Sequence, residues 1–381
     1  MIAAHVRIPA PIILDPVAAT LPEQIAVLPA AGVYALHAAG RPPYLSWSSS
    51  LRRRLSRLLV SSSGGTDSPI ARLRSNLISV ECWPTGSRLE TLLLLYGLSR
   101  VHYPDEYLAR LRLRMPWFIG LTRDDPFPRL RVMNRIPRQD VPVFGPFASR
   151  DFAQAYEQEV LSLFQIRRCT EVLAPDPNHP GCIYGEMNQC LRPCQCAVTA
   201  EEYETEAGRV ADFLSTNGRS TVTILSAARD RACEETDFEQ AAQIHKRLER
   251  VNAAVGARHE VVREIHHFDG VALTRASGKR QFRLWPMLHG LWQECVALDF
   301  SAEESQAKSL DHELRERLSQ SLSSPRTAGK RAEEVAIFSR WYFSSWRDGE
   351  WFPFQKLADL NYRRLVRQIS TMLKADNATA S

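Results

Sequence analysis

The segment CIYGEMNQCLRPCQC, residues 182–196, holds four of the chain's eight cysteines and constrains the fold more than any other stretch. With the preceding Cys169, it gives the spacing C-x12-C-x7-C-x3-C, formed by Cys169, Cys182, Cys190 and Cys194. Thiolates at such loop spacings can hold an iron–sulfur cluster or one tetrahedral zinc ion. Only the last pair resembles the short chelating loops of zinc sites. The spacing alone therefore predicts a metal centre and leaves the metal open.

The cysteines are expected to be reduced. Residues 1–30 lack the basic start, apolar core and cleavage site of a signal peptide, and no later window holds about 18 consecutive apolar residues. We therefore expect a cytoplasmic protein with no membrane partner. In a reducing compartment, clustered cysteines favour metal ligands or reactive thiols over disulfides. The isolated Cys82, Cys233 and Cys295 are expected to be small core residues.

The length of the chain predicts several domains, and the distribution of its charges indicates a surface that could bind phosphate. A chain of 381 residues with 44% hydrophobic content predicts two or three domains with their own cores. The net charge is only +5, but arginines concentrate in LRRRLSRLL, residues 51–59, and around Arg110, Arg112 and Arg114. Such patches suit phosphate backbones. A charge run taken alone is more often a solvated helix face.

The first hundred residues predict the order β-β-α-β-α. AGVYALHA and PPYLSW read as strands on either side of a turn at Gly40. SSSLRRRLSRLL predicts a helix with leucines on one face and arginines on the other. After a loop at residues 61–68, NLISVECW alternates like a strand, and SRLETLLLLYGLSR is apolar enough for a buried helix.

Later elements are predicted from capping signals and periodicity. In the aromatic segment 333–354, RDGEW is expected to form a turn between two strands of a packed aromatic layer. The remaining elements are strands in 128–149, a helix over 149–166 leading directly into Cys169, helices between 199 and 255, strands in 268–301, a helix and a Ser/Pro linker in 302–333, and a basic helix over 355–374.

Several motifs resemble the bacterial excinuclease subunit UvrC. FGPFAS, a helix, RRC and then C-x7-C-L-R-P-C are similar to the region where that family passes from its nuclease domain into its cysteine motif. The resemblance implies a 4Fe-4S cluster as cofactor. Its ligands would be Cys169, Cys182, Cys190 and Cys194.

The segment LPAAGVYALHAAGRPPYLSWSSSLRRRLSRLL is similar to the GIY-YIG nuclease core of the same family. The resemblance implies catalytic roles for Tyr34, Tyr44 and Arg54, with Mg²⁺ or Mn²⁺ if the site is active. It also implies DNA contacts by Arg52, Arg53, Arg54 and Arg57. The family's metal-binding glutamate falls on Leu95, which cannot ligate a metal. Glu90 could replace it only from a different face of the helix, at about 100° per residue. We therefore expect a degenerate site.

Downstream, DFEQAAQIHKRLERV, residues 237–251, resembles the UVR motif. That motif implies a helical hairpin that binds the UvrB helicase subunit. The resemblance covers about residues 20–300, and no helix-hairpin-helix signature follows.

These observations predict an α+β chain built from five segments. They are a degenerate GIY-YIG nuclease-like domain of mixed α/β structure (20–110), linking strands and a helix (111–168), a four-cysteine iron–sulfur module (169–198), a helical region with the UVR-like motif (199–257), and a truncated, β-rich C-terminal region of UvrC-like homology with a terminal helix (258–381).

Three functional hypotheses follow. The first is a nucleotide-excision-repair protein that binds DNA and UvrB, with a degenerate nuclease site and a 4Fe-4S cluster. The second is an active single-incision GIY-YIG endonuclease with a metal ligand that the sequence does not identify. The third is an iron–sulfur redox or metal sensor without a role on DNA.

Overall fold

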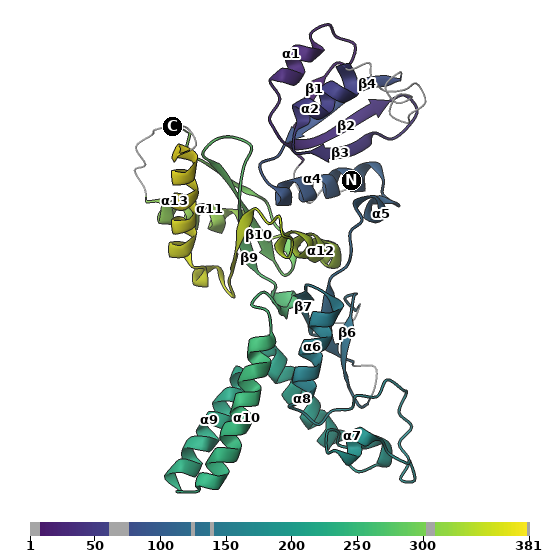
Figure 1. Ribbon diagram of the computed structural model, residues 1–381, viewed down its shortest axis with the longest axis vertical. Helices are drawn as coiled ribbons and strands as arrows, with labels where there is room; N and C mark the ends of the chain where they lie inside the picture. Colours follow the sequence, from purple (N-terminus) through teal and green to yellow (C-terminus); the bar gives the residue numbers. More distant parts are fainter. Residues whose placement is uncertain (1–7, 61–75, 123–125, 138–140, 302–308, 379–381) are drawn as a thin grey trace. The chain divides into compact units, whose positions relative to one another are not determined.

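The computed structural model describes residues 8–60, 76–122, 126–137, 141–301 and 309–378 (Figure 1). It has mixed α/β structure and divides into two compact units. The discontinuous unit combines Met1–Arg114 with Asp269–Ser381, and the middle unit is Met115–Phe268. The loop predicted at residues 61–68 lies outside the described residues.

The N-terminal part of the discontinuous unit is a sheet with strand order β1-β4-β2-β3. The predicted β-β-α-β-α order is confirmed, and a strand and a helix that the sequence did not predict precede it. The elements are β1 (Ile12–Leu14), α1 (Leu21–Ala26), β2 (Gly32–Ala38), β3 (Tyr44–Ser48), α2 (Leu51–Leu55), the π-helical turn η1 (Ser56–Val60), β4 (Leu77–Pro84), α4 (Arg88–His102) and α5 (Tyr107–Leu111).

The two faces of this sheet bury different helices. Alternate residues of a strand point to opposite faces. Tyr34 and Leu36 of β2 therefore pack with leucines of α2, whereas Val33 and Ala35 pack with leucines of α4. Gly32 is required where the layers meet, because a Cβ there would lie 2.3 Å from the carbonyl oxygen of Trp83.

The C-terminal part of the discontinuous unit is a second sheet, with strand order β11-β10-β9-β13 and β12 paired to β10. All its pairings are antiparallel; short connections join β9 to β10 and β10 to β11, whereas β13 returns to pair with β9 after α11 and α12. Its elements are β9 (Gly270–Arg275), β10 (Gln281–Leu288), β11 (Leu291–Trp292), β12 (Val296–Asp299), α11 (Leu310–Ser321), α12 (Arg331–Tyr342), β13 (Gly349–Pro353), the 3-10 turn η4 (Leu357–Asp359) and α13 (Tyr362–Ala378).

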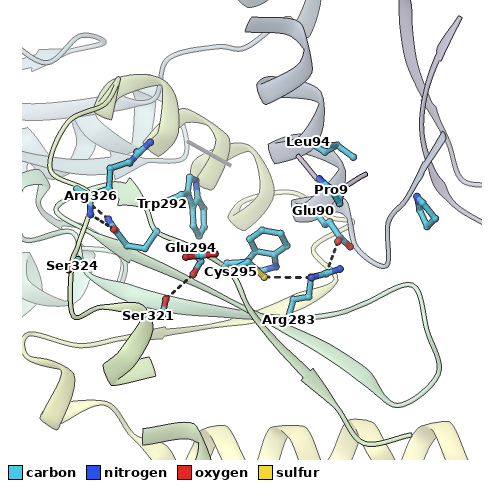
Figure 2. Close-up of a pocket in the computed structure, with 13 residues that line it drawn as sticks. Pro9, Glu90, Leu94, Arg283, Trp292, Glu294, Cys295, Ser321, Ser324 and Arg326 are labelled. Carbon is cyan, nitrogen blue, oxygen red and sulfur yellow. Dashed lines mark hydrogen bonds and ion pairs between the residues drawn. The ribbon is translucent and has the colours of Figure 1, made fainter. Parts of the chain in front are cut away.

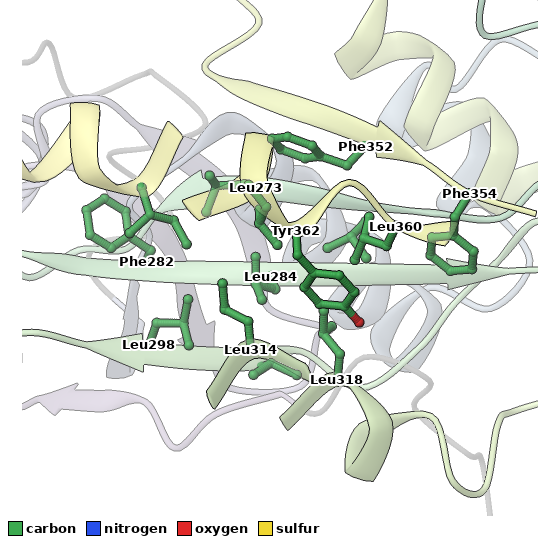
Figure 3. Packing of buried hydrophobic residues seen from close by; sticks show 14 of the residues in the cluster. Leu273, Phe282, Leu284, Leu298, Leu314, Leu318, Phe352, Phe354, Leu360 and Tyr362 are labelled. Atoms are coloured by element: carbon green, nitrogen blue, oxygen red, sulfur yellow. The ribbon is translucent and has the colours of Figure 1, made fainter. Parts of the chain in front are cut away.

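Figure 3 shows the main core of this second sheet, where Phe282 and Leu284 of β10 pack with Leu314 and Leu318 of α11 and with Tyr362 of α13. On the other face, Phe338 of α12 packs on aromatic side chains that include Trp351, with ring centroids 4.6 Å apart. The predicted aromatic layer is therefore confirmed. The predicted turn between two strands at RDGEW is wrong, because this segment joins helix α12 to β13.

The middle unit contains a third sheet, with strand order β6-β5-β7-β8. Its elements are β5 (Trp117–Leu121), β6 (Leu130–Met133), β7 (Val143–Phe147), α6 (Arg150–Leu161), α7 (Ile183–Glu186), the 3-10 turn η2 (Pro193–Gln195), α8 (Ala200–Thr216), α9 (Arg219–Glu234), α10 (Phe238–Ala257), β8 (Arg263–Glu264) and the 3-10 turn η3 (Ile265–His267). Helices α9 and α10 run side by side (Figure 1).

Two helix boundaries in the middle unit test the capping signals. Thr199 and Glu202 form the predicted capping box at the start of α8. The helix predicted over 149–166 starts as expected, after its N-cap Ser149, but it ends at Leu161. Cys169 is therefore reached through non-helical chain. Within the described ranges, none of the helices combines the length and hydropathy that a membrane-spanning segment requires.

Candidate functional site

The two tyrosines and the arginine predicted from the nuclease-like motifs lie together on the α2 face of the N-terminal sheet. Tyr34 pairs with Ser46, two residues from Tyr44, so both tyrosines point to the same face. Their ring centroids are 6.4 Å apart. Arg54 Nε donates a hydrogen bond to the Tyr34 hydroxyl at 3.2 Å. This hydrogen bond and the charge of Tyr34, followed by the smaller contribution of Tyr44, raise the pKa of Arg54.

The arginines of α2 and of the following turn η1, together called the α2 surface, divide into two groups. Arg54 is half-buried against Tyr34, whereas Arg52, Arg53 and Arg57 are exposed. Arg52 Nε also donates to the carbonyl of Leu28. The buried leucines of α2 hold the helix on the sheet and leave three guanidinium groups at the surface. Such a surface can attract a polyanion.

Leu95, the position at which the resemblance places a metal-binding glutamate, does not face the tyrosines. It packs with Val33, Ala35 and Trp83 on the α4 face of the sheet, opposite Tyr34. Because the sheet separates the two faces, a carboxylate at this position would not reach the Tyr34 hydroxyl.

Glu90, the alternative ligand, is engaged elsewhere. Its Oε2 accepts the N–H of Gly86 at 2.7 Å, and its Oε1 lies 2.7 Å from Arg283 Nε on β10. Figure 2 shows this pair at the edge of a cavity of about 580 Å³, with Trp292, Cys295 and Arg326 also on its wall. Burial raises the pKa of Glu90 despite the opposing effect of Arg283. Glu90 therefore links α4 to the second sheet.

A second buried carboxylate also links α4 to the C-terminal part. Glu333 of α12 accepts hydrogen bonds from the hydroxyls of Tyr96, at 2.7 Å, and Tyr107, at 2.8 Å. The sequence predicted that the helix containing Tyr96 is buried. It gave no signal for the polar partner, which lies more than two hundred residues away along the chain.

The four predicted metal ligands lie near enough for the charges of three of them to act on Cys190. Cys190 and Cys194 are buried, Cys169 is half-buried and Cys182 is exposed. Burial raises the pKa of the Cys190 thiol to about 11, and the charges of the other three cysteines add to this shift. Among the described residues, however, no three His, Cys, Asp or Glu side chains form a group arranged to hold a metal ion.

Local backbone geometry brings the cysteine segment together. Left-handed residues, including Asn188 (φ 55°), Arg192 (φ 56°) and Cys196 (φ 53°), turn the chain sharply around the short helix α7. The buried Arg167 donates from Nη1 to Cys169 Sγ at 3.6 Å and to the carbonyl of Glu171 at 2.9 Å. This guanidinium therefore holds the chain on both sides of Cys169.

The remaining cysteines differ in their burial. Cys82 is buried in the first sheet, as predicted, and Cys295 is half-buried in the wall of the cavity in Figure 2. The prediction for Cys233 is wrong, because this residue is exposed on α9. The fifth cysteine of the cluster region, Cys196, is exposed as well.

The Glu90 pair predicts a pH-dependent contribution to stability. The folded-state pKa of Glu90 is raised above its ordinary value of 4.5, so its contribution is fully present below pH 4.5 and is lost as the pH rises through the folded-state value. Urea unfolding at a series of pH values should therefore show wild type losing stability relative to Glu90→Gln as the pH rises. Glu106→Gln, a change at an exposed glutamate, is the control, and its stability should vary with pH as that of wild type does. A constant difference between wild type and Glu90→Gln would contradict this prediction.

Comparison with known proteins gives consistent matches. The family model described as "UvrC/Cho excinuclease, middle domain" matches residues 116–213. The UvrABC system protein C of Oleidesulfovibrio alaskensis is 30% identical over 240 residues, which are 63% of this chain and 34% of the relative. That of Anaeromyxobacter dehalogenans is 28% identical over 276 residues, 71% of this chain and 39% of the relative.

The chain thus spans between about a third and two fifths of the length of these curated relatives. No solved structure matches it. The matched family region covers most of the sheet of the middle unit, the cysteine segment and α8. The chain is therefore similar to UvrC-family proteins, through the middle-domain model over residues 116–213 and through these partial matches to UvrABC system protein C.

Proposed function

We propose that this chain is a nucleotide-excision-repair protein that binds DNA and a UvrB-like helicase subunit, and that its GIY-YIG nuclease-like domain is not catalytic. The family supports the repair role. The observation that carries the non-catalytic assignment is the position of Leu95, which lies on the opposite face of the sheet from Tyr34.

Phosphodiester hydrolysis explains why this position matters. Cleavage needs an activated nucleophile, a cation near the developing charge and a carboxylate that holds a divalent metal. The nucleophile could come from Tyr34 or Tyr44, and Arg54 could supply the cation. Leu95 has no carboxylate to hold the metal. The remaining role for this surface is to bind DNA through Arg52, Arg53, Arg54 and Arg57, in the manner of a phosphate-contacting helix.

Cleavage assays test the nuclease assignment. The purified chain, incubated with a nicked or lesion-bearing duplex, UvrB and Mg²⁺ or Mn²⁺, should leave the DNA intact. Leu95→Glu should not restore cleavage, because its carboxylate would lie on the wrong face. The UvrABC system protein C of Oleidesulfovibrio alaskensis serves as the positive control for the assay.

Cleavage by wild type that is lost in Tyr34→Phe would overturn the non-catalytic assignment and favour the single-incision endonuclease. Tyr362→Phe, which removes a hydroxyl from the core of the second sheet, is the matched control. Its activity should equal that of wild type in either case.

We also propose a 4Fe-4S cluster held by Cys169, Cys182, Cys190 and Cys194. The support is chemical: burial raises the pKa of the Cys190 and Cys194 thiols, and the charges of neighbouring cysteines add to both shifts. A cation among these thiols would convert that repulsion into coordination. Arg167 Nη1 donates to Cys169 Sγ and so fixes the position of one proposed ligand. When bound, such a cluster would cross-link a segment that has little regular secondary structure.

Iron content tests this proposal. Protein purified without oxygen should be brown and contain about four irons per chain if all four thiolates bind one cluster. Cys190→Ser should lose most of the iron and visible absorbance, whereas the exposed Cys233→Ser should retain both. Zinc in place of iron, or equal iron content in the two variants, would contradict the proposal.

The proposed partner surface lies on α9 and α10. Helix α10 buries Ala241, Leu248, Val251 and Ala254, whereas Phe238 at its start is 71% exposed. The fold does not explain the exposure of this large aromatic side chain, and such residues often anchor interfaces. A UvrB-like subunit binding at residues 237–251 would bury it.

A pull-down with UvrB tests this surface. Phe238→Ser should lower the affinity for UvrB by about tenfold or more without destabilising the chain, because the lost contact is intermolecular. Val172→Ser removes a side chain of the same unit that is 94% exposed, and it should bind as wild type does. Equal affinity of the two variants would remove residues 237–251 from the interface.

A further inference from the structure

The middle unit contains a cavity rich in arginine that no sequence motif predicted. The cavity has a volume of about 510 Å³ and lies beside β5, β6 and the start of α6. Its wall includes Trp117, Arg131, Asn134, Arg135 and Arg150. Arg131, Arg135 and Arg150 are exposed, so a ligand from solvent can reach them. This volume accommodates a nucleotide-sized molecule.

Positive charge dominates this wall. None of the described residues that line the cavity is acidic. The neighbouring Arg129 shows the effect of this crowding, because burial and then the charges of Arg131 and Arg167 lower its pKa. Glu157, on the same helix as Arg150, interacts with the N–H of Val132 and with Arg129 instead. The cavity therefore favours an anion.

The geometry of the wall indicates which anion. Three guanidinium groups offer planar, multidentate donors that match phosphate oxygens. Arg150 is the first residue of α6, so the N-terminal end of a twelve-residue helix adds partial positive charge beside it. The half-buried indole of Trp117 lies 5.7 Å from the Arg150 guanidinium and provides a flat apolar surface next to these donors.

We propose that this cavity binds an unpaired nucleotide of a DNA strand, with Arg131, Arg135 and Arg150 holding the phosphates and Trp117 stacking on the base. An unpaired base can reach such a platform, whereas the bases of a duplex are stacked on one another. The inference rests on the proposed role in DNA repair. It adds a second DNA contact, in a different unit from the arginines of α2.

Salt-dependent binding measures the number of phosphate contacts. The affinity of the full chain for a fluorescent single-stranded oligonucleotide, followed by anisotropy, should fall with salt. The triple variant Arg131→Gln, Arg135→Gln, Arg150→Gln should reduce the slope of log K against log salt by about 2, at about 0.7 per phosphate contact. The matched control is Arg209→Gln, Arg219→Gln, Arg231→Gln, which removes the same charge from exposed positions on α8 and α9. Its slope should equal that of wild type.

Two further measurements separate stacking from charge. Trp117→Leu should weaken single-strand binding several-fold without changing the salt slope. Wild type should bind the single strand more tightly than a blunt duplex of the same length, and the triple variant should lose this preference. Equal slopes for the cavity and control triples, in variants with unchanged melting temperatures, would overturn the inference.

The outcome for the cavity can be distinguished from that for the proposed function. Arg53→Gln with Arg57→Gln tests the α2 surface in the discontinuous unit. If this double variant binds DNA more weakly than wild type and the triple variant of the cavity arginines does not, the inference is wrong and DNA binding through the α2 surface stands. If wild type binds no DNA, both fail. Displacement of the oligonucleotide by inorganic phosphate as readily as by a nucleoside monophosphate would identify a simple anion site and also overturn the inference.

Discussion

Helix α4 is buried on both sides, and the discontinuous unit depends on this burial. Leu94, Leu95 and Leu98 pack against the first sheet, while Glu90 and Tyr96 reach partners of the C-terminal part. Carboxylates that are buried and paired are costly to separate, because each loses its compensating partner. Two such carboxylates, Glu90 from α4 and Glu333 from α12, join the two parts. These two contacts therefore hold the C-terminal part against helix α4 of the first sheet.

The same burial shapes the candidate nuclease surface. A helix that must pack apolar residues on one sheet and also supply two polar contacts to the C-terminal part has few positions left for a metal ligand. Leu95 fills one of the sheet-facing positions, and Glu90 is used by Arg283. Tyr34, Tyr44 and Arg54 remain together because the α2 face of the sheet has its own core, which does not depend on α4.

Local patterns predicted most of the fold. The leucines of α2, the capping box of α8 and the alternation of β4 each report on neighbours within a few residues, and each was correct. The errors arose where distant contacts decide the outcome. RDGEW has the residues of a tight turn, but Asp348 accepts a hydrogen bond from the N–H of Arg88, 260 residues away in the chain. In the same way, the arginines of the middle-unit cavity are scattered over residues 131–150, and only the sheet and α6 bring them to one wall.

The discontinuous unit also has an order of assembly imposed by synthesis. Its first sheet can form when residues up to about 100 have left the ribosome, but Tyr96 must wait for Glu333, 237 residues later. Until then, the outer side of α4 exposes apolar surface and unpartnered polar groups, and contacts this distant in sequence form slowly. The whole middle unit is made during this interval. The middle unit is compact by itself, so the contacts between α4 and α12 are the last of these contacts that synthesis makes possible.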